Sequence, residues 1–314
     1  MAEVLVVAEL VQGAVTKPTC ELVTLARRLG DPVVVVLGEG AEAVASKVGE
    51  YGATRVLAVT DPAIEEYLIA PKAEALAQVA ASVGPAAVLI TSTAEGKEIA
   101  GRLAIKLGSG LITDAVDIAA DGTTTQSVFA GNYRVSAAVN QGAPVVTVKP
   151  NAVAPETAPG SPAVESFAVT ISDAAKTARI TAREPKQASG RPSLTEAAVV
   201  VSGGRGTGGD FSEVEALADA LHGAVGASRA AVDSGWYPHA YQVGQTGKTV
   251  SPQLYVAAGI SGAIQHRAGM QTSKAVVAVN KDAEAPIFGL ADLGVVGDLH
   301  QVLTKVVEEI KQRG

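Results

Sequence analysis

The sequence predicts an α/β protein with two tandem doubly wound parallel-sheet domains, residues 1–190 and residues 191–314. Short apolar runs rich in Val and Ala are separated by about 20 to 35 residues, with helix-like segments between them. This spacing is typical of parallel strands joined by helical crossovers. The runs are apolar on both faces, as in strands that helices cover on both sides. The rhythm restarts near residue 190, and 314 residues with 47% hydrophobic and 18% charged side chains are enough for two cores.

The first domain is expected to begin with four buried strands and to end with a different pattern. The four strands are expected at residues 4–8, 33–37, 55–59 and 86–91. A hairpin with Gly131-Asn132 at its turn follows, and residues 144–149 and 166–171 read as further strands. Between these last two strands lies a segment with four prolines, residues 150–162, which predicts a stiff extended stretch.

The second domain repeats the α/β pattern with shorter connections. Its strands are expected at residues 197–201, 229–232, 254–258, 275–279 and 287–290. Ser212 and Glu215 have the spacing of a capping box at the start of a helix. The closing helix carries an apolar stripe from Leu299 to Ile310.

Composition and charge argue against several classes of function. A net charge of −7 without a cluster of Lys and Arg argues against nucleic-acid binding. One cysteine, Cys20, and four histidines without metal-ligand spacing predict no metal site. No apolar run approaches the roughly 20 residues that cross a bilayer, and the N-terminus has no signal-peptide pattern, so we expect no stable membrane insertion and a cytoplasmic location.

A glycine-rich loop follows the first strand of the second domain. Residues 204–209 fit the dinucleotide pattern with glycines at the first, third and sixth places, and Asp233 is expected to end the next strand, where it could hold a ribose. This loop leaves open, as an alternative function, an NAD(P)-dependent oxidoreductase that binds its cofactor here. Because many glycines satisfy many patterns, a flexible turn between strand and helix is also open.

Polar residues gather where the strands of the second domain end, the edge at which open parallel sheets bind ligands. The stretch Val243-Gly-Gln-Thr-Gly-Lys-Thr249 imitates a phosphate-binding loop, but it lacks the first glycine and the following helix of that motif. Taken singly, Ser261, Asn280 and Asp298 are better explained by structural roles as caps or turn residues. Ser228 and Arg229 fit the pattern least well, because they are expected to start a strand.

Five motifs then occur in one order. They are Ser202-Gly-Gly-Arg-Gly206, Gly226-Ala-Ser-Arg-Ala230, Val243-Gly-Gln-Thr-Gly-Lys248, Gly259-Ile-Ser-Gly-Ala-Ile-Gln-His266, and Asn280-Lys-Asp282 with Ala285-Pro-Ile-Phe288. In this order and spacing they closely resemble the alpha subunit of electron transfer flavoprotein. The resemblance is dense over residues 191–314 and looser over residues 1–190.

The resemblance implies an electron carrier rather than an enzyme that turns over a substrate. It implies FAD, one per heterodimer, held mainly by the second domain, and a beta subunit that completes the fold and holds an AMP. Electrons would arrive from acyl-CoA dehydrogenases and related dehydrogenases, as in fatty acid beta-oxidation. They would leave, through flavin semiquinone chemistry, toward the electron transfer flavoprotein–quinone oxidoreductase in the membrane.

The resemblance also implies roles for single residues. Arg229 would lie beside the isoalloxazine, Thr246 would donate near flavin N5, and His266 would lie near the pyrimidine carbonyl, where a protonated imidazole would favour reduction. The full set of implied cofactor-binding residues is Arg205, Ser228, Arg229, Val243, Gly244, Gln245, Thr246, Ser261, Gly262, Ala263, Ile264, Gln265, His266, Asn280, Asp298 and Leu299.

Overall fold

The computed structural model describes residues 2–11, 13–129, 131–183 and 190–313. It divides into two compact units, one of Met1–Val128 with Arg134–Pro185 and the other of Phe129–Tyr133 with Lys186–Gly314. The domain boundary expected near residue 190 adjoins residues 184–189, which lie outside the described residues.

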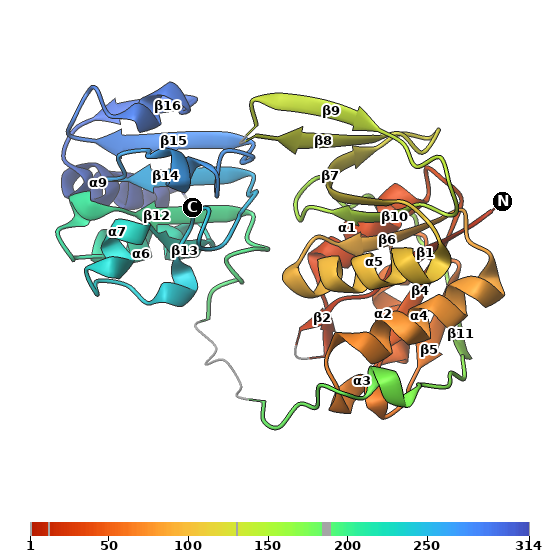
Figure 1. The fold of residues 1–314 in the computed structure, drawn as a ribbon. Helices are drawn as coiled ribbons and strands as arrows, with labels where there is room; N and C mark the ends of the chain where they lie inside the picture. Colours follow the sequence, from red (N-terminus) through yellow and green to blue (C-terminus); the bar gives the residue numbers. More distant parts are fainter. Residues whose placement is uncertain (1, 12, 130, 184–189, 314) are drawn as a thin grey trace. The chain divides into compact units, whose positions relative to one another are not determined.

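The main sheet of the first unit has nine strands among the described residues, in the order β11-β5-β4-β1-β6-β10-β7-β8-β9 (Figure 1). The pairs from β11 to β7 are parallel and β7 pairs antiparallel with β8, so the expected hairpin of β8 and β9 lies at one edge. The strands are β1 (Glu3–Val7), β4 (Asp31–Leu37), β5 (Arg55–Val59), β6 (Ala87–Thr91), β7 (Leu111–Ile118), β8 (Thr124–Val128), β9 (Tyr133–Ala137), β10 (Val145–Val148) and β11 (Ala163–Ser166). A separate short ribbon joins β2 (Leu10–Val11) and β3 (Ala14–Val15).

Helices cover both faces of this sheet, as the apolar strands predict. In β4, Val33 and Val35 pack with α4 (Ile69–Val83) and α5 (Ala94–Leu107), while Val34 and Val36 pack with α1 (Lys17–Ala26) and α2 (Ala41–Gly49). All four valines are fully buried. The unit also contains the short helices α3 (Ala63–Glu66) and η1 (Asp173–Ala175).

The strand expected at residues 166–171 is wrong in position, because the strand is β11 and ends at Ser166. Beyond it, the side chain of Gln78 in α4 donates to Thr170 O over 2.8 Å and accepts from Thr170 N over 3.0 Å. A side-chain amide therefore satisfies the backbone groups that a neighbouring strand would otherwise pair.

The second unit contains a parallel sheet that has, among the described residues, the five strands β13-β12-β14-β15-β16 in this order. They are β12 (Val199–Gly203), β13 (Ala224–Ala227), β14 (Leu254–Ala258), β15 (Ala275–Asn280) and β16 (Leu293–Val296). Helices α6 (Ser212–Ala220) and α9 (Leu299–Arg313) pack on one face, and loops carrying Met270 and Ile287 pack on the other. The predicted α/β fold class with parallel sheets is confirmed in both units.

The strand predicted at residues 229–232 is wrong. The strand is β13, and Arg229 begins the short helix α7 (Arg229–Asp233). Ser228 ends the extended segment because its Oγ accepts a hydrogen bond from Ala231 N over 3.3 Å, as an N-cap does. Ser228 and Arg229 therefore lie just beyond the carboxyl end of β13, whereas the sequence had placed them at the start of a strand.

Two smaller predictions in the second unit are also wrong. Residues 287–290 belong mainly to the 3-10 helix η4 (Pro286–Gly289), which starts at the fixed φ of proline, and the strand is β16 instead. The predicted capping box fails because Ser212 lies inside α6, whose N-cap is Phe211, while Asp210 Oδ1 accepts from Ser212 N over 2.9 Å. The remaining short helices of the unit are η2 (Arg205–Thr207), η3 (His239–Tyr241) and α8 (Ile264–Arg267).

Within the described ranges, none of the helices combines the length and apolar character needed to cross a bilayer. In the same part of the chain, no three His, Cys, Asp or Glu side chains are grouped so that they could hold a metal ion.

Candidate functional site

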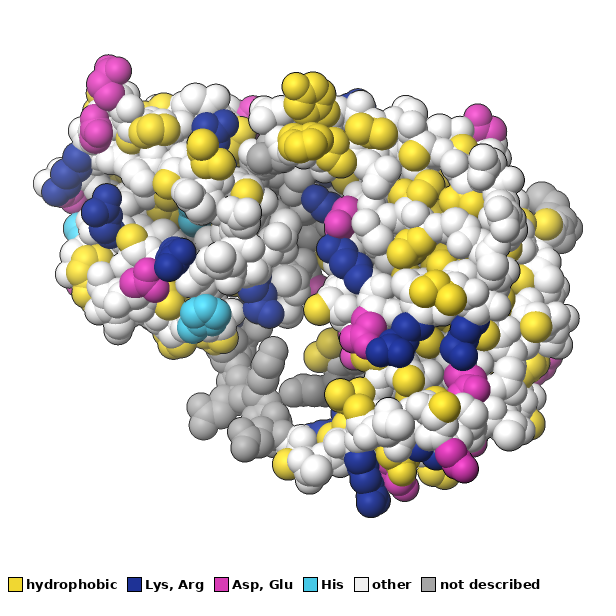
Figure 2. Space-filling model, viewed as in Figure 1, with side chains coloured by type: hydrophobic (Ala, Val, Ile, Leu, Met, Phe, Trp, Pro, Cys, Tyr) yellow, Lys and Arg dark blue, Asp and Glu magenta, His cyan; other side chains and the backbone are white. Residues whose placement is uncertain are grey.

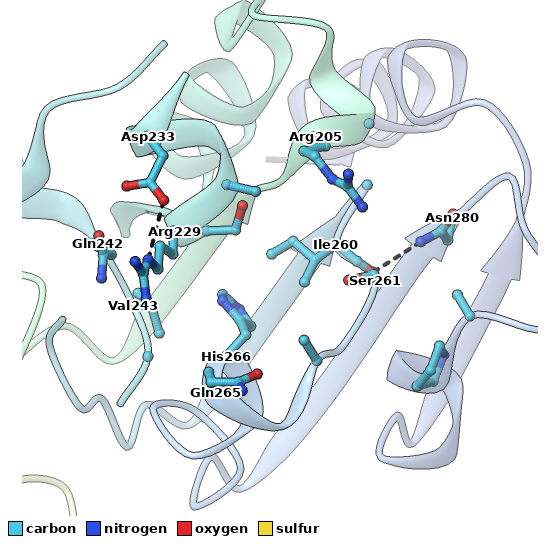
Figure 3. Close-up of a pocket in the computed structure, with 18 of the residues that line it drawn as sticks. Arg205, Arg229, Asp233, Gln242, Val243, Ile260, Ser261, Gln265, His266 and Asn280 are labelled. Carbon is cyan, nitrogen blue, oxygen red and sulfur yellow. Dashed lines mark hydrogen bonds and ion pairs between the residues drawn. The ribbon is translucent and has the colours of Figure 1, made fainter. Parts of the chain in front are cut away.

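A cavity of about 800 Å³ lies at the carboxyl edge of the second sheet (Figure 3). Strand β12 lies between β13 and β14, so the chain leaves β12 toward one side and returns on the other. In open α/β sheets, such a reversal of strand order leaves a crevice beyond the strand ends, and ligands bind there. The cavity has the size of pockets that hold cofactors.

Twelve of the sixteen residues expected to bind a cofactor line this cavity. They are Arg205, Ser228, Arg229, Val243, Gly244, Gln245, Thr246, Ser261, Ala263, Gln265, His266 and Asn280. They come from the loops after β12, β13, β14 and β15 and from residues 243–246. Segments distant in the sequence therefore meet because parallel strands end at one edge.

Four expected residues do not line the cavity. Asp298 caps α9 by accepting from His300 N over 3.0 Å, and its other oxygen pairs with Lys281 Nζ at 2.8 Å. Leu299 is buried in the core with α6, Ile264 is largely exposed, and Gly262 is buried in the loop after β14. Asp298 therefore has the helix-capping role that the sequence analysis considered for it.

Two guanidinium groups border the cavity. Arg229 Nε lies 3.2 Å from Asp233 Oδ2, and both side chains are more than 60% exposed. Arg205, from the loop after β12, forms no ion pair with another described residue and lines the same space (Figure 3). An anionic ligand in the cavity would therefore lie near two guanidinium groups. That of Arg229 is paired with a carboxylate, and that of Arg205 forms no ion pair with another described residue.

The loop of residues 242–248 presents Thr246 to the cavity in a defined orientation. Val243 N donates to Ala227 O over 2.9 Å, which ties the loop to the end of β13. The buried Gln242 donates from Nε2 to Thr246 Oγ1 over 3.0 Å. Because this bond uses a lone pair of the threonine oxygen, the hydroxyl proton of Thr246 stays available for a ligand.

His266 lies in α8 and is 6% exposed. Its Nε2 is 2.9 Å from the hydroxyl oxygen of Tyr255, a fully buried residue of β14, whereas Nδ1 is buried without a hydrogen-bond partner among the described residues. Burial lowers the pKa of His266 to about 4, against a smaller opposing effect of the Val243 backbone. The imidazole is thus neutral at neutral pH in this structure, which differs from the protonated imidazole considered from the sequence.

Asn280 combines a place in the cavity wall with a structural role. Its Nδ2 donates to Ile260 O over 2.9 Å, and its Oδ1 accepts from Asp282 N over 3.1 Å. Asn280 therefore joins the loops after β14 and β15, and the turn-shaping role left open from the sequence is present alongside its contact with the cavity.

The glycine-rich loop at 204–209 differs from a dinucleotide-binding turn. Gly204 N and Gly206 N donate to Ala258 O and Gly259 O, each over 2.9 Å, so these amides are not free to hold a pyrophosphate. A Cβ on Gly206 would lie 2.6 Å from Gly259 Cα, so glycine is required for packing between loops. Asp233 ends helix α7 rather than a strand, and the expectation that placed it for a ribose is wrong in this respect.

Ten further residues line the cavity that were not among the sixteen expected to bind FAD, although Gly206 and Asp233 had been considered for the dinucleotide alternative. They are Gly206, Ala230, Asp233, Trp236, Gln242, Gly259, Ile260, Asp282, Ala285 and Pro286. Gly259 and Ile260 directly follow β14, so the strand-end rule alone could have found them. Trp236 and Gln242 carry no such signal, because they follow the short helices α7 and η3 and do not directly follow a strand.

Comparison with known proteins agrees with this location. The family described as "Electron transfer flavoprotein FAD-binding domain" matches residues 193–271, and "Electron transfer flavoprotein domain" matches residues 4–172. Among similar proteins, the electron transfer flavoprotein subunit alpha of Mycobacterium leprae is 54% identical, with 100% of this chain and 99% of the relative covered. The chain belongs to the electron transfer flavoprotein alpha-subunit family.

Other members of the family also match over nearly their whole length. The subunit alpha of Mycobacterium tuberculosis is 56% identical over 100% of this chain and 99% of the relative, and that of Syntrophomonas wolfei is 43% identical over 99% and 100%. As a family member the chain is an electron carrier, its FAD-binding domain matches the unit that contains the cavity, and its family implies a beta subunit as partner.

Proposed function

We propose that this chain is the FAD-binding subunit of a heterodimeric electron carrier whose beta subunit holds an AMP. In this proposal one FAD is bound per heterodimer, in the cavity at the carboxyl edge of the second sheet. The carrier accepts electrons from acyl-CoA and related dehydrogenases in fatty acid beta-oxidation and passes them to a membrane quinone oxidoreductase. When bound, FAD supplies one-electron redox chemistry at its isoalloxazine ring.

The observation that carries the proposal is the set of unused donors in a cavity of cofactor size. Arg205 has no ion-pair partner among the described residues, the Thr246 proton is free, and Nδ1 of His266 is buried without a partner there. Buried polar groups normally have partners, so an unpaired one in a cavity wall is consistent with a ligand that supplies acceptors. FAD has acceptors along both its ring and its pyrophosphate.

The side chains have distinct tasks in this proposal. Arg205 and Arg229 provide positive charge that favours an anionic ligand, with Asp233 moderating Arg229. Thr246, held by Gln242, donates a hydrogen bond, and Gln265 and Ser261 orient the ligand. These roles follow from donor chemistry and position in the wall.

A partner subunit is supported by exposed aromatic side chains as well as by family membership. Phe129 and Tyr133, beside the hairpin turn, are 77% and 64% exposed, with ring centroids 5.7 Å apart. Figure 2 shows hydrophobic side chains gathered over the hairpin of β8 and β9. Exposed aromatic pairs of this kind are typical of interfaces.

The cytoplasmic location expected from the sequence stays a prediction, which cell fractionation tests.

The experiment is co-expression with the beta subunit, followed by native mass spectrometry and identification of the released chromophores. The expected result is a yellow 1:1 complex that releases one FAD and one AMP. Release of NAD(P), with turnover of a small substrate, would instead support the oxidoreductase alternative. A heterodimer that takes up no FAD would contradict the proposal. Reduction of that complex by an acyl-CoA dehydrogenase with its substrate tests the electron donor.

A further inference from the structure

Tyr255 lies beneath the cavity without lining it. It is in the central strand β14, where it pairs with Val200 of β12 and Val276 of β15, and its side chain is fully buried among apolar residues. A tyrosine hydroxyl in such a place needs a hydrogen-bond partner, since an unpaired buried polar group is costly. A phenylalanine would fill the same space without this need.

The hydroxyl oxygen of Tyr255 lies 2.9 Å from Nε2 of His266. In a neutral imidazole one nitrogen carries the proton and the other accepts a hydrogen bond. A tyrosine hydroxyl has one proton to donate, and His266 Nε2 lies at hydrogen-bond distance to accept it. Burial raises the pKa of Tyr255 well above its ordinary value, against a smaller opposing effect of the Ser202 hydroxyl, so the phenol keeps its proton.

We propose that Tyr255 is a positioning residue that donates its proton to His266 Nε2 and so holds the imidazole in the tautomer with its proton on Nδ1. The second ring nitrogen then becomes an N–H donor for an acceptor atom of the ligand in the cavity. This rests on the proposed FAD site for the identity of that ligand, but the tautomer itself does not depend on it.

Two observations support this assignment of the donors. Nδ1 is buried with no partner among the described residues, although His266 belongs to the cavity wall. Figure 3 shows the imidazole beside the space that Arg205 and Gln265 also border. The reverse tautomer would leave the Tyr255 proton without the Nε2 acceptor and would offer the ligand a lone pair. Flavin carbonyl oxygens need a donor, which only the proposed tautomer supplies from a neutral ring.

The test is nitrogen NMR of the FAD-loaded heterodimer, with ¹⁵N-labelled histidine in this chain. The signal of His266 is assigned by its loss in His266→Gln. The expected wild-type result at neutral pH is a protonated, pyrrole-type Nδ1 and an unprotonated, hydrogen-bonded Nε2. A protonated Nε2 with an unprotonated Nδ1 would overturn the proposal without the need for any variant.

Tyr255→Phe tests the role of the hydroxyl, with Tyr237→Phe as the matched control. Tyr237 also donates a side-chain hydrogen bond, to Glu215 over 2.8 Å, but it does not line the cavity. In Tyr255→Phe the Nε2 signal should shift toward an unbonded nitrogen and the FAD dissociation constant should rise about fivefold, the equivalent of the roughly 1 kcal/mol that a hydrogen bond contributes. Tyr237→Phe should change neither. An unchanged Nε2 signal in Tyr255→Phe would overturn the proposal.

The chromophore content of the same samples separates the two proposals. A colourless complex whose His266 carries its proton on Nδ1 would contradict FAD binding but support the role of Tyr255. A yellow complex with the proton on Nε2 would support FAD binding and overturn the role of Tyr255.

Discussion

The charge pair of Arg229 and Asp233 predicts opposite effects of two substitutions on the flavin potential. A unit charge about 4 Å from the site of reduction contributes ~1 kcal/mol in water and ~4 kcal/mol at an effective dielectric constant of 20. At about 59 mV per 1.4 kcal/mol for one electron, this range corresponds to roughly 40–170 mV. The Arg229 side chain is 63% exposed, which favours the lower half of that range.

Arg229→Ala should therefore lower the first one-electron potential by roughly 40–100 mV, and Asp233→Asn should raise it by a smaller amount, because it frees the guanidinium from its partner. Both shifts should shrink at high ionic strength, since the pair is exposed. The assay is a redox titration of the heterodimer at two salt concentrations.

Arg313→Ala is the matched control for this pair of substitutions. Arg313 forms an exposed pair of the same spacing with Glu309, 3.1 Å apart, in α9 and away from the cavity wall. Its removal should leave the potential unchanged. An unchanged potential in Arg229→Ala, or shifts of the same sign in Arg229→Ala and Asp233→Asn, would refute the electrostatic reasoning.

Three further predictions concern the cavity wall and the loop after β14. Thr246→Val should change the gap between the first and second one-electron potentials by about 40 mV, the equivalent of one hydrogen bond, and an unaltered gap in a redox titration would remove Thr246 from the mechanism. Gly262→Ala should lower the free energy of unfolding in urea by about 2–4 kcal/mol, because the φ of +85° is strained and the new Cβ would lie 2.6 Å from Ile287 Cα. Gly289→Ala, with nothing within 4 Å, should cost far less, and equal costs would contradict the packing argument. Because burial depresses the pKa of His266 from 6.5 to about 4, the unfolded state binds the proton more readily, so stability should fall by up to about 3 kcal/mol as pH drops from 6.5 to 4. His266→Gln should lack this loss, and a wild-type pH slope in urea titrations of the variant would show that His266 is not its source.

Sequence reasoning predicted most of the strands because buried strands carry their signal locally, but it misplaced those expected at residues 166–171, 229–232 and 287–290. In β4, Val33 to Val36 alternate between two cores, so a continuous apolar run is the only pattern that fits both faces. The short run after Ser228 was misassigned because three apolar residues, Ala230 to Val232, fit a strand and a helical turn equally well. There the Ser228 cap decides the outcome.

The candidate site was predicted in position but not in its internal bonding. Most of the residues that were selected with the rule that ligands bind beyond the ends of parallel strands line one cavity. The hydrogen bond between Tyr255 and His266 joins a buried residue of β14 to the short helix α8, and no local sequence pattern indicates it. Asp298 was selected by motif spacing, yet its oxygens are used by the start of α9 and by Lys281.

The central claim is that FAD occupies the cavity beyond β12 and β14. The most direct measurement is the FAD bound per heterodimer in the wild type and in Ala263→Trp, which places an indole in the cavity wall. Ala240→Trp is the control, because Ala240 is exposed in η3 and is not part of that wall. We predict one FAD in the wild type and in Ala240→Trp and little or none in Ala263→Trp. Full FAD binding by folded Ala263→Trp would contradict the claim.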